Sequence, residues 1–148
     1  MKKFSLLILL SFFVLSCSSD NSEDVSVKEG SFLDVYNGVI WSIDPPDRIF
    51  EETEWFIYTP NGVTEYFYNL SDCKTYTFKW GDKNFDGVPI KLLENSKNLL
   101  KIETNNGDGI TVSSLSVSED GNFLNSVNKQ DGFPEYTDKW YKVSKPCL

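Results

Sequence analysis

The chain has 148 residues, of which 22 are acidic and 14 are basic, and it contains no histidine. Its formal net charge of −8 repels nucleic-acid phosphates and anionic lipid headgroups, which excludes a nucleic-acid-binding protein. Without histidine the chain also lacks a Ser-His or Cys-His nucleophile pair and an imidazole metal ligand.

Residues 1–16 have the pattern of an export signal. Lys2 and Lys3 precede an apolar run over residues 4–15, which is too short to span a bilayer. Residues 14–17, with the sequence Val-Leu-Ser-Cys, resemble the lipobox of bacterial lipoproteins, in which the cysteine becomes a lipid-modified N-terminus. The alternative is an ordinary signal peptide with a chance cysteine near the cleavage site. The pattern favours a lipoprotein signal peptide.

The resemblance implies that Cys17 carries a thioether-linked diacylglycerol and an N-linked acyl chain such as palmitate. Such chains anchor firmly, because each buried methylene contributes about 0.8 kcal/mol. In many Gram-negative species an Asp directly after the acylated cysteine retains a lipoprotein in the inner membrane. In this chain that position is Ser18, so we expect the protein to be anchored to the outer membrane, on its periplasmic or its surface face. Residues 17–31 are then the acylated cysteine and a flexible acidic tether. Removing residues 1–16 leaves a mature net charge of −10, so we expect the membrane to be met through the lipid alone.

An acylated Cys17 cannot pair, which leaves Cys73 and Cys147. Outside the cytoplasm two thiols in one small domain are usually joined, so we expect a disulfide between them. Closing this loop of 74 residues would stabilise the fold by roughly 4 kcal/mol in the chain-entropy model. The alternative is a reactive thiol or a metal ligand, but the chain has no histidine to act as base or co-ligand.

Residues 32–148 are enough for one domain with one hydrophobic core. Residues 32–37 place apolar side chains at helical spacing and predict a short helical turn, which Gly38 ends. Residues 39–43 are the first predicted strand. The two prolines that follow stop it, because proline cannot donate to a strand ladder.

The rest of the domain alternates apolar segments with turn signals at short intervals, which is typical of an antiparallel all-β domain. The further predicted strands cover residues 49–50, 55–58, 63–70, 74–80, 88–93, 99–104, 110–117, 123–127 and 137–144. Pro60, Asn61 and Gly62 predict a hairpin turn, because Asn-Gly tolerates positive φ. The apolar parity changes within residues 110–117, so we expect a β-bulge at Ser113 and Ser114.

Eight or nine short strands in sequential order, with no covering helix, protect their edges when they close into a barrel. The predicted fold is therefore all-β, a small antiparallel meander barrel of about eight strands, which either fills with side chains or holds one small ligand. Gly38-Val39-Ile40-Trp41, which opens the first strand after a short helical turn, looks like the Gly-x-Trp entry of lipocalins. Residues 32–148 are similar to the lipocalin-like, calycin-type domains of exported bacterial lipoproteins.

Residues 82–87 match the start of a calcium loop, in which oxygen ligands at alternate positions surround the ion, here Asp82, Asn84 and Asp86. The twelfth position of such a loop is a bidentate Glu, and in this chain it is Leu93. The alternative is a polar hairpin loop of turn-forming residues, which fits the pattern better. Calcium is the single cofactor that the sequence leaves open.

Aromatic residues make up 15% of the chain. Most are expected in the core, because strand aromatics dominate small β cores. The number of tyrosines exceeds what a dry core needs, which favours a partly polar pocket, since each buried hydroxyl needs a partner. The residues expected to bind a ligand there are Trp41, Tyr66, Tyr68, Tyr76, Phe78, Trp80 and Trp140.

Together these features predict a non-enzymatic, lipid-anchored, lipocalin-like protein of the cell envelope that binds a small hydrophobic or amphipathic ligand as a monomer. One alternative is an acidic interaction module that inhibits a cationic enzyme such as lysozyme by electrostatic attraction. Another is a purely structural envelope component. The enzymatic alternative is a glycosidase, which requires two carboxylates within about 10 Å in a cleft.

Overall fold

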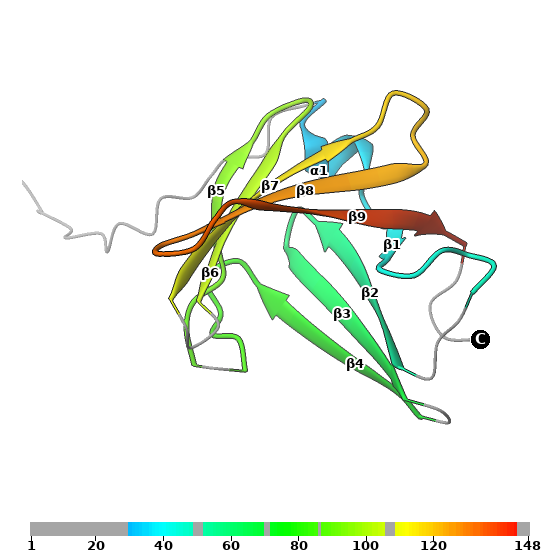
Figure 1. Cartoon of the computed structure of the whole chain (residues 1–148), viewed down its shortest axis with the longest axis horizontal. Helices are drawn as coiled ribbons and strands as arrows, with labels where there is room; N and C mark the ends of the chain where they lie inside the picture. The colour runs from blue at the N-terminus through cyan, green and yellow to red at the C-terminus, as the bar shows by residue number, and fades with distance from the viewer. Residues whose placement is uncertain (1–29, 49–51, 70–71, 86, 106–108, 145–148) are drawn as a thin grey trace, which may run out of the picture.

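The computed structural model describes residues 30–48, 52–69, 72–85, 87–105 and 109–144. These residues form one short helix and nine strands (Figure 1). The elements are α1 (Phe32–Val35), β1 (Ile40–Ser42), β2 (Glu52–Thr59), β3 (Gly62–Asn69), β4 (Asp72–Lys79), β5 (Lys91–Asn95), β6 (Leu100–Asn105), β7 (Ile110–Val117), β8 (Phe123–Gln130) and β9 (Tyr136–Val143). The predicted all-β fold is confirmed.

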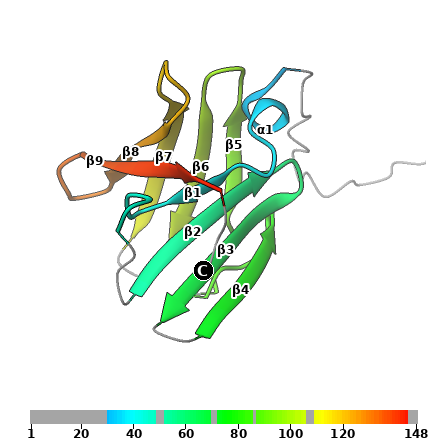
Figure 2. The ribbon, with the colours of Figure 1, turned by 90° about the vertical axis from the view of Figure 1, so that its right-hand side faces the viewer.

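The nine strands belong to one antiparallel sheet with the order β4-β3-β2-β1-β9-β8-β7-β6-β5. Every neighbour is consecutive in the chain except β1 and β9, so the sheet is a meander whose first and last strands pair in its middle. The sheet curls into a half-barrel with β4 and β5 at its two edges (Figures 1 and 2). The predicted antiparallel meander is therefore present, with nine strands.

The two ends of the connection between β4 and β5 are joined by backbone hydrogen bonds. The N–H of Gly81 donates to the carbonyl of Ile90 at 2.7 Å, and the N–H of Ile90 donates to the carbonyl of Asp82 at 2.9 Å. An isolated bridge joins Lys83 and Pro89 within the same connection. The segment leading into β5 therefore pairs with the segment leaving β4, and the two strands remain edges.

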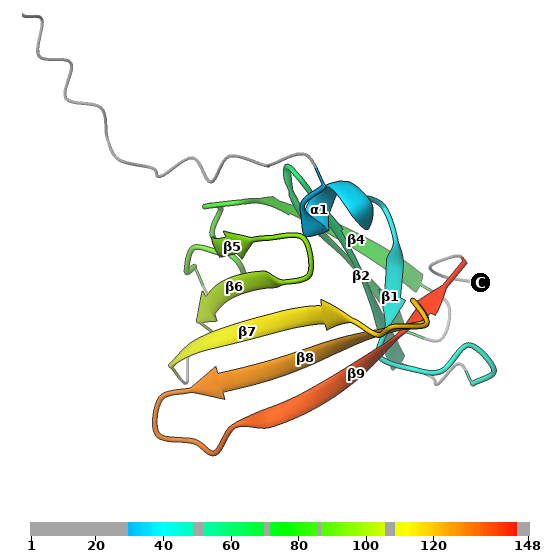
Figure 3. The ribbon, with the colours of Figure 1, turned by 90° about the horizontal axis from the view of Figure 1, so that it is seen from above.

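Helix α1 closes one end of the half-barrel, as Figure 3 shows from above. Ser31 caps it, because its Oγ lies 2.8 Å from Oδ2 of Asp34 and its own N–H donates to the same oxygen. The helix is fixed to the end of β5, since the N–H of Leu33 donates to Oδ1 of Asn95 at 3.1 Å. Phe32 and Leu33 are fully buried. The predicted helical turn is confirmed, and it carries two core residues.

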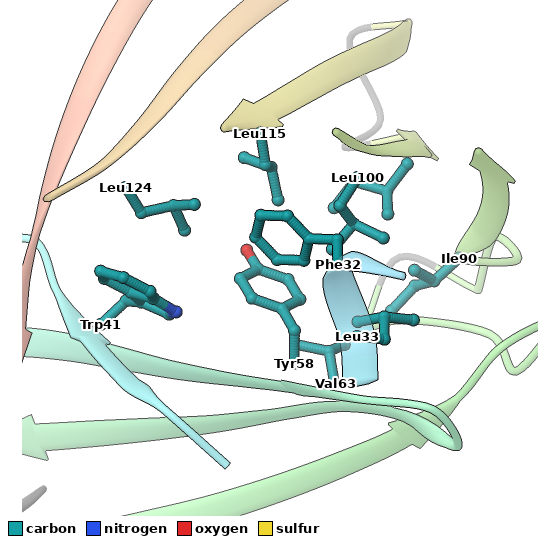
Figure 4. Packing of buried hydrophobic residues seen from close by; sticks show 10 residues of the cluster. Phe32, Leu33, Trp41, Tyr58, Val63, Ile90, Leu100, Leu115 and Leu124 are labelled. Atoms are coloured by element: carbon teal, nitrogen blue, oxygen red, sulfur yellow. The ribbon is translucent and has the colours of Figure 1, made fainter. Parts of the chain in front are cut away.

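The hydrophobic core lies inside the curl of the sheet, on the surface that we call the concave face (Figure 4). Its strand residues include Trp41, Tyr58, Leu100, Leu115 and Leu124, each less than a tenth exposed. Paired residues of antiparallel neighbours point to the same side, so the pairing registers assign every strand residue to the concave face or to the opposite, convex face. Burying these side chains is the main favourable contribution to folding.

The alternation predicted for residues 74–80 is confirmed. Tyr76 and Phe78 are half-buried on the concave face, whereas Thr75, Thr77 and Lys79 are exposed. The Pro-Asn-Gly hairpin turn is confirmed too, because β2 ends and β3 begins around it. The predicted strand at residues 49–50 lies outside the described residues.

The β-bulge predicted at Ser113 and Ser114 is wrong. Strand β7 pairs without a register shift with β6 over residues 110–115 and with β8 over residues 111–117. Ser113 instead faces the concave side and donates to Oδ1 of Asn128 at 2.6 Å, so the half-buried serine has a partner and no shift of register is needed. The irregularity lies in β5, between Leu92 and Glu94.

No helix in the described part of the chain is long and apolar enough to cross a membrane.

Candidate ligand-binding site on the concave face

The concave face changes character along the strands. Near α1 it is apolar, whereas further along β7, β8 and β9 it carries hydrogen-bonded polar side chains. The Oγ atoms of Ser113 and Ser126 both donate to Oδ1 of Asn128, at 2.6 and 2.9 Å. Nδ2 of Asn128 donates to Oδ2 of Asp138 at 2.8 Å. One wall of the half-barrel is therefore polar and internally satisfied.

The facing wall, formed by β2 and β3, carries two acidic residues on the concave face. Glu54 shares its parity with Phe56 and Tyr58, and Glu65 is paired directly with Phe56. Both glutamates are half-buried. No ion pair joins either carboxylate to a lysine or arginine in the described ranges. Two carboxyl groups therefore lie among aromatic side chains without a cation.

The environment raises the pKa of both carboxyl groups. Burial raises the pKa of Glu54 above its usual value of 4.5. Burial raises the pKa of Glu65 as well, and the nearby charge of Glu54 raises it further. The two groups therefore sense each other, and each holds its proton more tightly than an exposed glutamate.

Aromatic rings surround this pair of glutamates. Phe56 contacts Trp140 of β9 edge to face, with ring centroids 4.9 Å apart, and stacks beside Tyr58 at 6.4 Å. Tyr76 of β4 is paired with Glu65 and lies on the same face. The rings of Phe56 and Trp140 come from β2 and β9, the two strands that flank β1 in the sheet.

Two polar atoms lie at the centre of the half-barrel, and one of them, Nε1 of Trp41, is buried without a hydrogen bond in the described part of the chain. Trp41 is fully buried, and its Nε1–H has no partner within the described part of the chain. Tyr58 is 7% exposed, and burial followed by the charge of Glu65 raises the pKa of its phenol. Figure 4 shows the indole nitrogen and the phenol oxygen both directed into the middle of the half-barrel. Each is a donor that favours a polar partner there.

The structure divides the residues that the sequence predicts to bind a ligand. Trp41, Tyr76, Phe78 and Trp140 lie on the concave face. Trp80 packs against the core at the end of β4 and donates its Nε1–H to the carbonyl of Pro60 at 3.1 Å.

Tyr66 and Tyr68 lie on the convex face, because they are paired with Thr75 and Cys73, away from Tyr76 and Phe78. Tyr68 contacts Trp55 edge to face at 6.1 Å. Trp55 is 4% exposed, so the convex face has a small buried aromatic contact of its own. These two tyrosines do not join the concave-face group.

The loop that resembles a calcium site uses its polar side chains to close itself. Oδ2 of Asp82 accepts from the N–H of Lys79 at 2.9 Å, and Oδ1 of Asn84 accepts from the N–H of Val88 at 3.1 Å. Asp86 lies outside the described residues. The described ranges contain no group of three or more acidic or cysteine side chains that could hold a metal ion. The hydrogen bonds match the hairpin-loop interpretation.

Cys73 is disulfide-bonded and belongs to β4, on the convex face. Cys147 and the proposed lipidation site Cys17 both lie outside the described residues. The pairing of Cys73 with Cys147 therefore stays a prediction.

The sequence interpretation missed Glu54, Glu65 and Phe56 as members of a site. A signal was available for Glu54, which shares its parity with Phe56 and Tyr58, but not for Glu65, because the aromatic residues of β3 lie on both faces. Phe85 was missed as well. It lies 4.7 Å from Tyr76 and 5.2 Å from Phe78, measured between ring centroids, although it is 65% exposed in the loop after β4. Loop residues carry no periodicity, so only the fold reveals this contact.

No protein family, curated protein sequence or solved structure matches this chain.

Proposed function

We propose that this protein is a lipid-anchored, non-enzymatic component of the cell envelope whose half-barrel binds one small amphipathic ligand on its concave face. The observation that carries the proposal is the placement of Glu54 and Glu65 among aromatic rings, with no ion pair to a lysine or arginine of the described residues. Burying a carboxyl group costs free energy unless a partner compensates it. A site that keeps two of them is better explained by a ligand than by packing.

The composition of the concave face supports this proposal. Ligand sites are mostly apolar and contain a few polar groups that fix the orientation of the bound molecule. Here the apolar part is formed by the half-buried rings of Phe56, Phe78 and Trp140, and the polar part consists of Glu54 and Glu65. An amphipathic molecule presents both characters at once.

The cellular location in this proposal comes from the sequence of residues 1–17. An acylated Cys17 would hold the domain at the outer membrane through an acidic tether that ends near residue 31. The strong negative charge of the chain disfavours direct contact with anionic headgroups, so the concave face would remain free to meet a ligand. The similarity to lipocalin-like domains, with their single internal ligand, agrees with this arrangement.

Native mass spectrometry tests the proposal directly. The mature chain carrying Cys17→Ser, exported to an oxidising compartment and purified without detergent, should retain a small molecule or bind added decanol. Decanol has an apolar chain and a neutral polar end, so it tests the amphipathic character alone. If no small molecule is retained and decanol does not bind at any concentration below its solubility, a protein partner becomes the better explanation.

A further inference from the structure

We propose that the edge strand β4 pairs with β4 of a second copy of this chain, in antiparallel orientation about a two-fold axis at Tyr76. The inference does not depend on ligand binding, because it concerns the rim of the half-barrel and not its interior. It replaces the monomer expected from the sequence with a dimer of defined geometry. In Figures 1 and 2 no described element lies beyond β4 on its outer side.

The backbone of β4 presents unpaired groups along that outer side. In an antiparallel ladder the N–H and C=O groups of successive residues point alternately to the two neighbouring strands. The N–H of Trp80 donates toward β3, to the carbonyl of Asn61 at 3.3 Å, whereas the N–H of Lys79 points away from β3 and donates to a carboxylate in the turn that follows. The odd-numbered residues of β4 therefore point outward. Among them, Thr75 and Thr77 have no backbone hydrogen bond to a described residue on that side.

The opposite edge of the sheet is protected in ways that β4 is not. Strand β5 has five residues and an irregularity between Leu92 and Glu94. Helix α1 covers its end, because the N–H of Phe32 donates to the carbonyl of Ser96 at 2.7 Å. Strand β4 is paired with β3 over all eight of its residues without a register shift, and it contains no proline. Short, irregular or covered edges resist pairing with another chain, whereas long regular edges accept it.

The sequence of β4 suits pairing with itself about Tyr76. A two-fold axis perpendicular to the sheet keeps the concave faces of both copies on one side and places Tyr76 opposite the partner's Tyr76. Lys74 then lies opposite the partner's Phe78, and on the convex side Thr75 lies opposite the partner's Thr77. Aromatic pairs, a cation beside a ring and threonine pairs are favourable cross-strand neighbours. This register also lets the outward backbone groups of Thr75 and Thr77 bond to each other across the axis.

The charge of β4 allows contact between two acidic copies. The chain has a formal net charge of −8, so two copies repel each other in general. Strand β4 itself carries two lysines, Lys74 and Lys79, and one acidic residue, Asp72, so its own net charge is +1. The two copies therefore meet through strands that are not acidic. Added salt screens the repulsion between the rest of the two chains and should strengthen the dimer.

An exposed aromatic side chain beside β4 supplies apolar area for the same contact. Phe85 is 65% exposed, although its ring contacts those of Tyr76 and Phe78 on the concave face. An axis at Tyr76 brings this group of three rings from both copies to one side of the joined sheet. Backbone hydrogen bonds alone gain little over hydrogen bonds to water, so the burial of these rings is the larger favourable contribution.

Sedimentation equilibrium of the mature Cys17→Ser chain across the micromolar range tests the association. We expect a monomer–dimer equilibrium that shifts toward the dimer as salt is added. Thr75→Pro removes an outward N–H and leaves the hydrogen bonds to β3 in place, so it should weaken the dimer about tenfold, which corresponds to about 1.4 kcal/mol. Thr75→Val keeps this N–H and should dimerise like the parent chain. Circular dichroism of both variants checks that the sheet is formed.

Single cysteines locate the interface in a chain without the added proline, so they test the inference even if Thr75→Pro does not fold. Tyr76→Cys places two thiols opposite each other across the axis, where the Cα atoms of such a pair are about 4.5 Å apart, within reach of a disulfide. We expect mild oxidation to give a covalent dimer. Leu93→Cys, at a 44% exposed position of β5, should remain monomeric under the same conditions.

A chain that stays monomeric up to high micromolar concentration would overturn the dimer, leave the proposed ligand binding untouched and favour a strand of a different protein at this edge. Association that is unchanged in a folded Thr75→Pro, or a covalent dimer formed equally well by Leu93→Cys, would overturn the role of β4. A covalent dimer that forms faster in Thr75→Cys than in Tyr76→Cys would overturn the register.

Discussion

Glu54 on β2 and Glu65 on β3 lie diagonally across one pair of strands on the concave face, and the charge of Glu54 raises the pKa of Glu65. The arrangement is costly for the free protein, because like charges at this spacing oppose each other and burial weakens their hydration. The repulsion between the two carboxylates should therefore affect the stability of the protein as well as ligand binding.

The stability of the free protein should depend on the charge of Glu65. The pKa of this carboxyl is raised above its usual 4.5, so the folded state binds the proton more tightly than the unfolded state does. The contribution of Glu65 is then most favourable at low pH and is lost as the pH rises from about 4.5 through the raised pKa. Glu65→Gln should therefore stabilise the protein more at about pH 8 than at about pH 5.

Urea unfolding at the two pH values measures this difference. Glu119→Gln serves as the control, because Glu119 is exposed and should show the same small effect at both. A Glu65→Gln effect that is independent of pH would contradict the raised pKa.

The core near α1 should carry much of the stability. Leu100 is fully buried, so Leu100→Ala removes packed atoms and leaves a cavity that costs about 2–5 kcal/mol. Leu93 is 44% exposed at the irregularity in β5, and Leu93→Ala should cost well under 1 kcal/mol. Chemical denaturation of both variants compares the same substitution inside and outside the core. Similar losses would argue against the burial described for Leu100.

Asn95 should hold α1 in place. Its Oδ1 accepts from the N–H of Leu33 and its Nδ2 donates to Oγ of Ser31, at 3.1 Å in each case. Asn95→Ala leaves a buried N–H without a partner, which costs about 1–3 kcal/mol. Tyr36 contacts the ring of Trp41, so loosening of the helix should also change tryptophan fluorescence. Asn125→Ala, at an exposed position of β8, should change neither quantity.

Gly62 should be the least replaceable glycine of the described turns. Its φ is +155°, and a Cβ built at this position would lie 1.9 Å from the carbonyl oxygen of Phe78. Gly62→Ala must therefore shift the backbone of β3 or β4, at a cost above the roughly 1–3 kcal/mol of conformational strain alone. Gly121 also has positive φ, at +73°, but nothing lies within 4 Å of its Cβ position. Thermal unfolding should rank Gly62→Ala as more destabilising than Gly121→Ala.

The disulfide partner of Cys73 can be identified by exclusion. If Cys147 is the partner, Cys147→Ser should leave Cys73 reactive toward a thiol reagent and destabilise the domain by roughly 4 kcal/mol. The variant Cys17→Ser should keep Cys73 protected. Protection lost in Cys17→Ser and retained in Cys147→Ser would contradict the predicted pairing and the acylation of Cys17 together.

The local features of the fold were predictable where the pattern is periodic. The alternation of Tyr76 and Phe78 with threonines identified the faces of β4, and the Pro-Asn-Gly segment identified the turn before β3. The predicted bulge at Ser113 failed for a physical reason. A serine at a core-facing position indicates a shift of the strand register only if it has no hydrogen-bond partner. Ser113 has one, because Asn128, fifteen residues further along the chain, accepts its hydrogen bond.

The candidate site was predictable only in part. The sequence indicates that aromatic strands line the interior, and Trp41, Tyr76, Phe78 and Trp140 do lie on the concave face. It also grouped Tyr66 and Tyr68 with them. Consecutive aromatic residues in β3 show no alternation, so the sequence does not indicate which of them face the interior. Glu54 and Glu65 looked like solvated acids, since charged residues in strands usually face water.

The sequence by itself determined the elements of this protein: the turn positions, the alternating faces, the all-β class and the acidic charge. Each depends on neighbours within a few residues, where backbone geometry and side-chain periodicity act directly. Only the tertiary structure decided that β1 pairs with β9, that β4 and β5 remain edges, and that Glu54, Glu65 and Trp140 converge on one face. Those relations depend on the register between strands distant in sequence, which the packing of the whole core selects.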